Sequence, residues 1–146
     1  MSYVNSVLMP GETVVESARI HWFIFVPDIV LLMIAFWFSS SHTILFMVMV
    51  LFVIYLFARD LIYFFTTELA LTNKRVIAKF GWIKRDTIEL NLTRVESLSV
   101  NQSIFGRIFN FGTLIINGIG GVRTPIPVIE NPLAFRSRTL DLLDKM

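Results

Sequence analysis

The sequence contains no cysteine, which excludes disulfide bonds, thiolate metal sites and a cysteine nucleophile. Its two histidines, His21 and His42, are expected near opposite ends of one helix, so they cannot share a metal ion. Glu89 and Glu96 lie at separate strand positions without a histidine nearby, and no nucleophile, base and orienting group can be combined. The sequence therefore predicts a protein that is not an enzyme, with no catalytic residues, no metal ion and no cofactor.

Charge is also scarce. Charged residues make up 16% of the chain, against about 25% in typical soluble domains. Apolar residues make up 55%, and the mean hydropathy is +0.68. The first 19 residues contain two acids and one late arginine, so they lack the basic start of a cleaved signal peptide. We therefore expect the apolar block that follows to remain in the mature protein.

That block extends over residues 20–65, and a polar centre, SSSHT at 39–43, divides it. A helix that crosses a bilayer needs about 20 mainly apolar residues. The pattern predicts a two-helix transmembrane hairpin with spans at about 20–38 and 43–60. A re-entrant hairpin that does not cross fully is the alternative, because Pro27-Asp28 would start the first helix late.

Basic residues flank only one side of this hairpin. Arg19 precedes the first span, Arg59 follows the second, and 11 further basic residues come after Arg59, whereas the connecting loop has none. Basic residues accumulate on the cytoplasmic side of membrane proteins. We therefore predict a multi-pass protein of the plasma (inner) membrane with both termini cytoplasmic. Residues 1–19 would form a cytoplasmic N-terminal segment and residues 66–146 a cytoplasmic domain.

From residue 66 onward, apolar and polar residues alternate with a period of two, as in half-buried strands. The alternation predicts five to seven short antiparallel strands, and the first two form a β-hairpin over residues 68–81 with its turn at 72–75. Asn131-Pro132 predicts the start of a C-terminal helix, with Asn131 as its cap and Leu133, Leu140 and Leu143 as its apolar stripe. We expect this helix to cover an open end of a curved sheet.

Several motifs support a family resemblance. They are LMPGE at 8–12, HW at 21–22, ELALTNKRVI at 68–77 and NQSIFGRIFNFGT at 101–113. With these motifs the chain resembles the bacterial PH-domain family, membrane-attached proteins formerly grouped as a domain of unknown function. The resemblance implies a membrane α-helical hairpin plus a mainly-β PH-like domain, with a curved antiparallel sheet or partial barrel and a C-terminal capping helix. It implies little biochemistry.

The candidate binding site is basic. Residues 74–85 carry a local charge of +5 without an acid, from Lys74, Arg75, Lys79, Lys84 and Arg85. The cytoplasmic leaflet is anionic, so these side chains are candidates for contact with membrane lipids or a phosphorylated ligand, and we expect Lys74 and Arg75 to face the cytoplasm near lipid. The alternative is that these residues belong to a solvated β-hairpin that binds no ligand. Nucleic acid is not an expected partner, because the charge is modest and no recognition helix accompanies it.

Asp28 is the one acid in residues 20–58 and lies inside the first predicted span, where acids are costly and often functional. It is a candidate proton site or a partner for a charge on another subunit. The alternative is an interfacial group beside Pro27.

The function that these patterns favour is a membrane-anchored PH-like interaction or scaffold module at the cytoplasmic face. It would act through homo-oligomerisation or a protein partner in a membrane complex. The alternatives are binding of anionic lipid or a phosphorylated ligand through residues 74–85, and a small transport or proton-conducting oligomer that uses Asp28.

Overall fold

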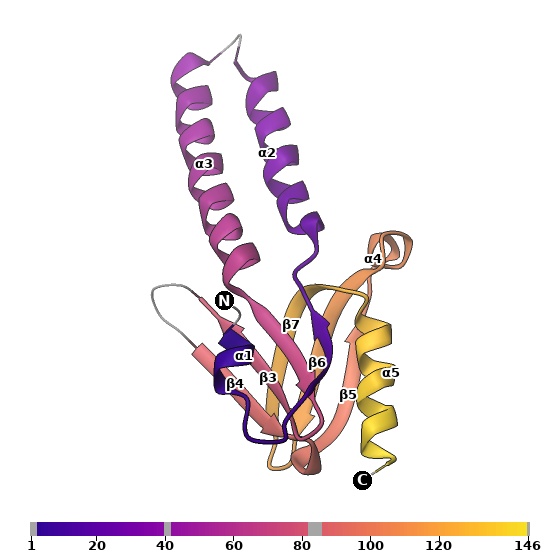
Figure 1. Ribbon diagram of the computed structural model, residues 1–146. Coiled ribbons are helices and arrows are strands. Elements are labelled where there is room, and N and C mark those ends of the chain that lie inside the picture. The colour runs from indigo at the N-terminus through magenta and orange to yellow at the C-terminus, as the bar shows by residue number, and fades with distance from the viewer. Residues whose placement is uncertain (1–2, 40–41, 82–85, 146) are drawn as a thin grey trace.

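A helical hairpin stands on a mainly-β domain in the computed structural model, which describes residues 3–39, 42–81 and 86–145 (Figure 1). The hairpin consists of α2 and α3, and the domain carries the N- and C-terminal ends of the chain. The described helical elements are α1 (Tyr3–Val7), the 3-10 helix η1 (Trp22–Phe25), α2 (Val26–Trp37), α3 (Thr43–Thr66), the 3-10 helix η2 (Leu92–Arg94), α4 (Ile104–Ile108) and α5 (Pro132–Leu143).

Two antiparallel sheets build the domain. The first has the order β1 (Val14–Ala18), β2 (Glu68–Thr72), β3 (Arg75–Phe80) and β4 (Asp86–Asn91), and the second has the order β5 (Val95–Asn101), β6 (Phe111–Gly118) and β7 (Val122–Glu130). A single antiparallel bridge between Ile20 and Ile129 joins them at one corner. In the described part of the chain β4 does not pair with β5, so the sheet is not closed. The mainly-β antiparallel prediction is confirmed in this open form.

The hydrophobic core lies between the two sheets and under α5. Its side chains alternate along β2 and β3, and they include Leu69, Leu71, Val76 and Ala78, each at most 3% exposed. The opposite face of β2 and β3 is also buried, because Ala70 and Ile77 pack against Val4 of α1. Both faces of the β2–β3 hairpin are therefore covered. The polar turn between these two strands gave no reason to expect this.

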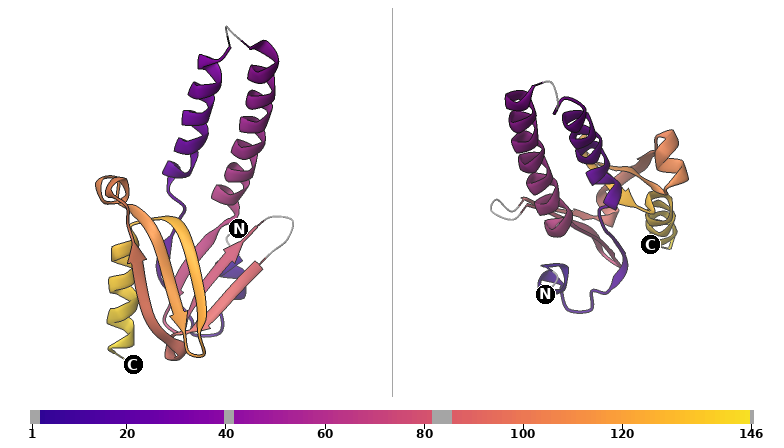
Figure 2. Two further views of the ribbon diagram at one scale, coloured as in Figure 1. Left: turned by 180° about the vertical axis from the view of Figure 1, so that it is seen from behind. Right: turned by 90° about the horizontal axis from the view of Figure 1, so that it is seen from above.

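The N-terminal segment belongs to the domain. The sequence predicts a separate segment at residues 1–19 and a domain that begins at residue 66, but Ala18 pairs with Leu69 and Ser17 pairs with Ala70 in the sheet. The helical hairpin is thus an insertion between two neighbouring strands, β1 and β2. Figure 2 shows the same arrangement from behind and from above, with both feet of the hairpin at one end of the domain.

Among the described residues one helix, α3, is long and apolar enough to cross a membrane, and Trp22–Trp37 forms a shorter apolar helix. The first predicted span is therefore shorter than expected, beginning with a 3-10 turn before Pro27. The multi-pass topology stays a prediction at this point.

The C-terminal helix begins at Pro132, as predicted, but two details differ. Asn131 has a left-handed backbone (φ 49°) and its side chain does not cap the helix. The buried face consists of Pro132, Phe135 and Thr139 instead of the predicted stripe, of which Leu133 and Leu140 are exposed and Leu143 is half-buried. Spacings of three and four residues place these three side chains on one helical face, so Phe135 supplies the main anchor on the sheets.

Candidate functional site

The five basic residues of the candidate site do not form one exposed cluster. Arg75 is buried, at 7% exposed. Its guanidinium donates two hydrogen bonds to the carboxylate of Glu12. Its Nε lies 2.9 Å from Oε1 and its Nη2 lies 2.9 Å from Oε2. Nη2 also donates to the carbonyl of Val7 at 2.8 Å, and Nη1 forms an ion pair with Glu89. The prediction of an exposed Arg75 is therefore wrong, because the N-terminal segment folds over it.

The Glu12 carboxylate also accepts hydrogen bonds from other parts of the chain. The Thr72 hydroxyl donates to its Oε1 at 2.7 Å, and the backbone N–H of Met9 donates to its Oε2 at 2.8 Å. Burial raises the pKa of Glu12, but the hydrogen bonds from Arg75, Met9 and Thr72 outweigh burial and lower this pKa to about 2. The carboxylate thus stays ionised inside the fold and ties the N-terminal segment to the β2–β3 turn.

This ion pair predicts an acid-sensitive step in stability. The folded-state pKa of Glu12, about 2, lies below the ordinary value of 4.5, so its contribution is complete above pH 4.5 and disappears as the pH falls toward 2. We expect the free energy of unfolding to drop by on the order of 3 kcal/mol across this window from Glu12 alone. Chemical denaturation at a series of pH values measures the drop. Glu12→Gln should flatten this part of the profile. Equal profiles for the wild type and Glu12→Gln would contradict the assignment.

Lys74 lies at the end of the domain away from the helical hairpin. Strand β2 starts just after α3 and runs away from it, so five strand residues, roughly 17 Å at about 3.3 Å each, separate the β2–β3 turn from the hairpin (Figure 1). The Lys74 ammonium donates to the carbonyl of Pro10 at 3.3 Å. The expected position of Lys74 beside lipid is thus wrong for a membrane that contains the hairpin.

Lys79 has local partners of its own. Its ammonium lies 3.9 Å from the Glu68 carboxylate and 5.3 Å from the centre of the Tyr3 ring. Lys84 and Arg85 fall outside the described residues. The structure therefore gives each of Lys74, Arg75 and Lys79 a contact within the domain.

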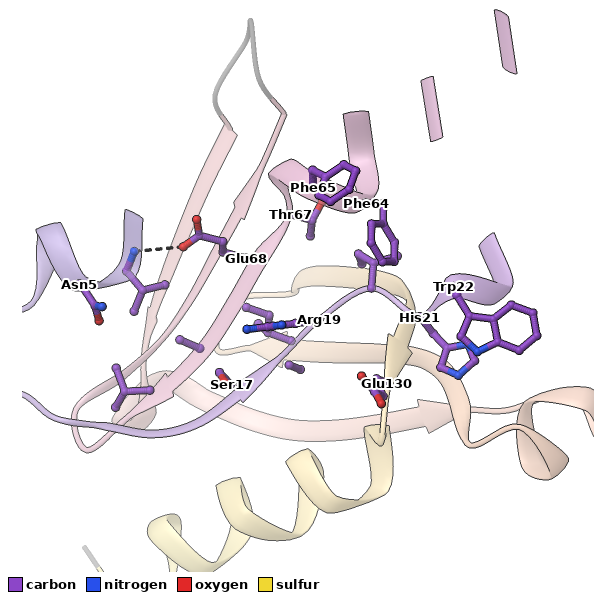
Figure 3. Close-up of a pocket in the computed structure, with 16 residues that line it drawn as sticks. Asn5, Ser17, Arg19, His21, Trp22, Phe64, Phe65, Thr67, Glu68 and Glu130 are labelled. Carbon is purple, nitrogen blue, oxygen red and sulfur yellow. Dashed lines mark hydrogen bonds between the residues drawn. The ribbon is translucent and has the colours of Figure 1, made fainter. Parts of the chain in front are cut away.

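A different site is visible where the domain meets the hairpin. A pocket of about 680 Å³ lies between α1, β1, β2 and the end of α3 (Figure 3). A second hollow of about 310 Å³ lies on the α5 side of β1. The two share Ser17, Ala18, Arg19 and Glu130. We call this continuous surface along β1 the β1 groove.

The β1 groove combines an edge strand with mixed charge. β1 is the outermost strand of its sheet, and Val14, Val15 and Arg19 along it are exposed. Its far end is tied to β7 by the backbone N–H of Glu130, which donates to the carbonyl of Arg19 at 2.9 Å. Arg138 of α5 lies 3.9 Å from Glu16, which lines the second hollow. An edge strand beside a groove can accept an extended peptide segment through backbone hydrogen bonds.

Glu68 closes the opposite side of the β1 groove and organises α1. Its carboxylate accepts from the backbone N–H of Tyr3 at 3.2 Å and from that of Val4 at 3.3 Å, and Figure 3 draws the second of these hydrogen bonds. This surface was not predicted from the sequence, because the predicted strands all follow the apolar block. The signal was the β-branched pair Val14-Val15, followed by Ala18 and Ile20 at alternate positions.

Asp28 lies in the first turn of α2 and is 4% exposed. An acid in the first turn of a helix faces the positive end of the helix dipole. Asp60 of α3, also buried, acts electrostatically on Asp28 and forms an ion pair with Arg59 at 2.7 Å. The structure thus brings Asp28, Arg59 and Asp60 together at the foot of the hairpin, a grouping that the sequence did not predict. In the described ranges no group of three or more His, Cys, Asp or Glu residues is suited to hold a metal ion.

Comparison with known proteins agrees with this architecture. The family model described as "Bacterial PH domain" matches residues 17–143, which include the last two residues of β1, the helical hairpin and α5. Searches of curated proteins and of solved structures gave no match. Since the matched region covers most of the chain, the protein belongs to the bacterial PH domain family.

Proposed function

We propose that this protein is a membrane-anchored interaction module, in which the helical hairpin holds the PH-like domain at the cytoplasmic face and the β1 groove receives a protein segment. The observation that carries the proposal is the position of β1. It is an edge strand, it borders the groove, and it leads directly into the foot of the hairpin. A partner bound there would be held next to the membrane.

The anchoring part of the proposal is supported by strand pairing. Ala18, just before the hairpin, pairs with Leu69, just after it, so both feet of the hairpin must lie on one side of any membrane. α3 has 24 residues and is about 36 Å long, enough for a hydrocarbon core of about 30 Å. If α3 crosses, α2 must bring the chain across as well.

The shorter helical segment of the hairpin, Trp22–Trp37, is compatible with such a crossing. Trp22–Trp37 is roughly 26 Å long from its 3-10 and α-helical rises. Trp22 and Trp37 at its two ends are exposed, and tryptophan is typical of membrane interfaces. A short span is accommodated by local thinning of the bilayer. The basic residues on one side of the hairpin favour a cytoplasmic domain in the inner membrane.

The partner that fits the β1 groove is an extended protein segment, from another protein or from a second copy of this chain. Backbone groups at a sheet edge pair with any extended backbone, and the exposed Val14 and Val15 add apolar contacts. Glu16 and Arg19 give the groove charges of both signs, which suits a polypeptide better than a lipid phosphate. Lipid recognition through Lys74, Arg75 and Lys79 is less favoured, because these side chains already have partners within the domain.

Site-specific crosslinking tests the proposal. A photo-crosslinking residue at Val15 in the full chain should give a covalent adduct in intact membranes, because Val15 is exposed on the edge strand. Thr93 of η2, exposed elsewhere on the domain, is the matched control position and should give no adduct. Co-expression of two differently tagged copies distinguishes self-association from a second protein. Equal labelling from both positions, or none from Val15, would remove the β1 groove as the binding surface.

A further inference from the structure

α4 carries an apolar surface that the domain does not cover. Three apolar side chains of α4 and that of its C-cap residue are exposed, and we call this set the α4 surface. Its members are Ile104, Phe105, Ile108 and Phe109, at 79%, 61%, 68% and 43% exposed. Single exposed apolar residues are common, but a contiguous group of large ones marks a binding surface.

The backbone beneath the α4 surface is fixed by polar contacts. The Ser103 hydroxyl caps the helix by accepting from the N–H of Gly106 at 3.1 Å. The side-chain amide of Gln102 donates to the carbonyls of Gly106 and Phe111, at 3.2 and 3.0 Å. A Cβ on Gly106 would lie 2.6 Å from the Phe111 carbonyl oxygen, so the close approach requires glycine. The polar residues of the QSIFGR motif therefore hold a short helix whose apolar residues face outward.

The α4 surface lies beside the foot of the hairpin (Figure 1). The ring centres of Phe23 and Phe105 are 6.4 Å apart, and those of Phe23 and Phe109 are 5.6 Å apart. Trp22 meets Phe109 edge-to-face at 6.0 Å. Trp22 and Phe23 belong to η1, which leads directly into α2. The α4 surface is thus continuous with the apolar residues that begin the hairpin.

We propose that the α4 surface inserts into the interfacial layer of the bilayer leaflet from which the hairpin emerges, as a second membrane contact of the domain. The proposal rests on the membrane anchoring proposed above. Because Trp22 marks the interface depth and touches Phe109, α4 lies at the level of the lipid headgroups and the first acyl carbons.

Charge supports a lipid occupant over a protein one. Residues 101–113 contain no acid, and Arg107 of α4 is exposed among the apolar side chains. An apolar set with one cation is the pattern of an interfacial helix, in which the cation meets lipid phosphates and the aromatic rings enter the acyl boundary. The contact would fix the tilt of the domain and so the direction in which the β1 groove faces.

The absence of native cysteine allows a direct depth measurement. Full-length variants Phe105→Cys and Ile108→Cys, each labelled with the fluorophore NBD, are reconstituted into vesicles of phosphatidylcholine and phosphatidylglycerol. Nitroxide groups near the headgroup end of the acyl chains should then remove most of the fluorescence at both positions. Ile119→Cys is the matched control, since Ile119 is equally exposed but lies in the β6–β7 turn at the opposite end of the domain, and its label should keep its fluorescence.

A label at Val48→Cys, exposed on α3, reports on anchoring separately. If Val48 is quenched while positions 105 and 108 behave like 119, the α4 proposal fails and the anchoring stands. If Val48 is not quenched either, the anchoring itself fails. Labels at 105 and 108 that escape both the lipid nitroxides and aqueous iodide would show that a second copy covers α4, which also overturns the proposal.

Discussion

Replacing Arg75 with alanine is expected to lower the free energy of unfolding by about 3–5 kcal/mol, the cost of leaving a buried charge without its partner. Glu12 has a fully buried side chain, and both of its oxygens accept from the Arg75 guanidinium. Without Arg75 this carboxylate must take up a proton or leave the domain interior. Either outcome releases the segment before β1, so α1 should separate from the outer face of β2 and β3.

Chemical denaturation of the full chain in detergent micelles measures this loss, and limited proteolysis reports on the N-terminal segment. Lys74→Ala is the matched control. It removes the same charge from the adjacent residue, but Lys74 is exposed and donates a single long hydrogen bond, so its effect should stay within about 0.5 kcal/mol. Similar losses for the two variants would mean that the charge of the turn matters and the buried ion pair does not.

Arg75 also shows where sequence reasoning reaches its limit. The alternation of Leu69, Leu71, Val76 and Ala78 predicts their strands and their burial, because the period of two is local information. The fate of Arg75 depends on Glu12, 63 positions away along the chain. Nothing in the TNKR turn indicates that Arg75 will pair with a distant acid. Without knowledge of that pairing, the basic turn resembles an exposed ligand site.

The candidate site was missed for a related reason. β1 is a short strand that the sequence separates from β2 by the whole helical hairpin, and the two meet only when the hairpin folds back. The apolar block predicts two helices but gives no sign that the strands on either side pair. The β1 groove is a product of that pairing. The family resemblance, by contrast, was predictable from motifs, and the family match confirms it.

The QSIFGR and FGT motifs acquire a physical explanation from the structure. Gln102 and Ser103 hold α4 through hydrogen bonds, and Gly106 and Gly112 allow the chain to pass closely at the base of the helix. The apolar residues of this stretch stand at helical spacing in the sequence, and α4 is the resulting turn of helix. The two glycines leave room for these close approaches, because a Cβ at either position would lie less than 3 Å from a backbone carbonyl oxygen.

Gly112→Ala is therefore expected to be the second strongly destabilising change. A Cβ at this position would lie 2.7 Å from Cγ of Gln102 and 2.8 Å from the carbonyl oxygen of Asn101. The oxygen belongs to the β5 backbone, which is paired with β6 through Asn101 and Thr113, so it cannot move away without breaking that register. Overpacking of this kind costs about 1–3 kcal/mol and more when backbone must shift, so we expect a loss of at least about 2 kcal/mol.

Gly118→Ala provides a control in the same strand. A Cβ there would meet mainly the methyl ends of Leu90, at 3.2 and 3.5 Å, and a flexible side-chain end can give way by a few tenths of an ångström. Its effect should stay below about 1 kcal/mol, since the new methyl group requires no backbone movement. Denaturation of both variants gives the comparison, and NBD fluorescence at position 105 reports whether α4 has moved. Gly112→Ala should shift this fluorescence and Gly118→Ala should not. A Gly112→Ala variant as stable as the wild type would show that β5 and β6 are free to separate at this point, and that α4 is not held by their close approach.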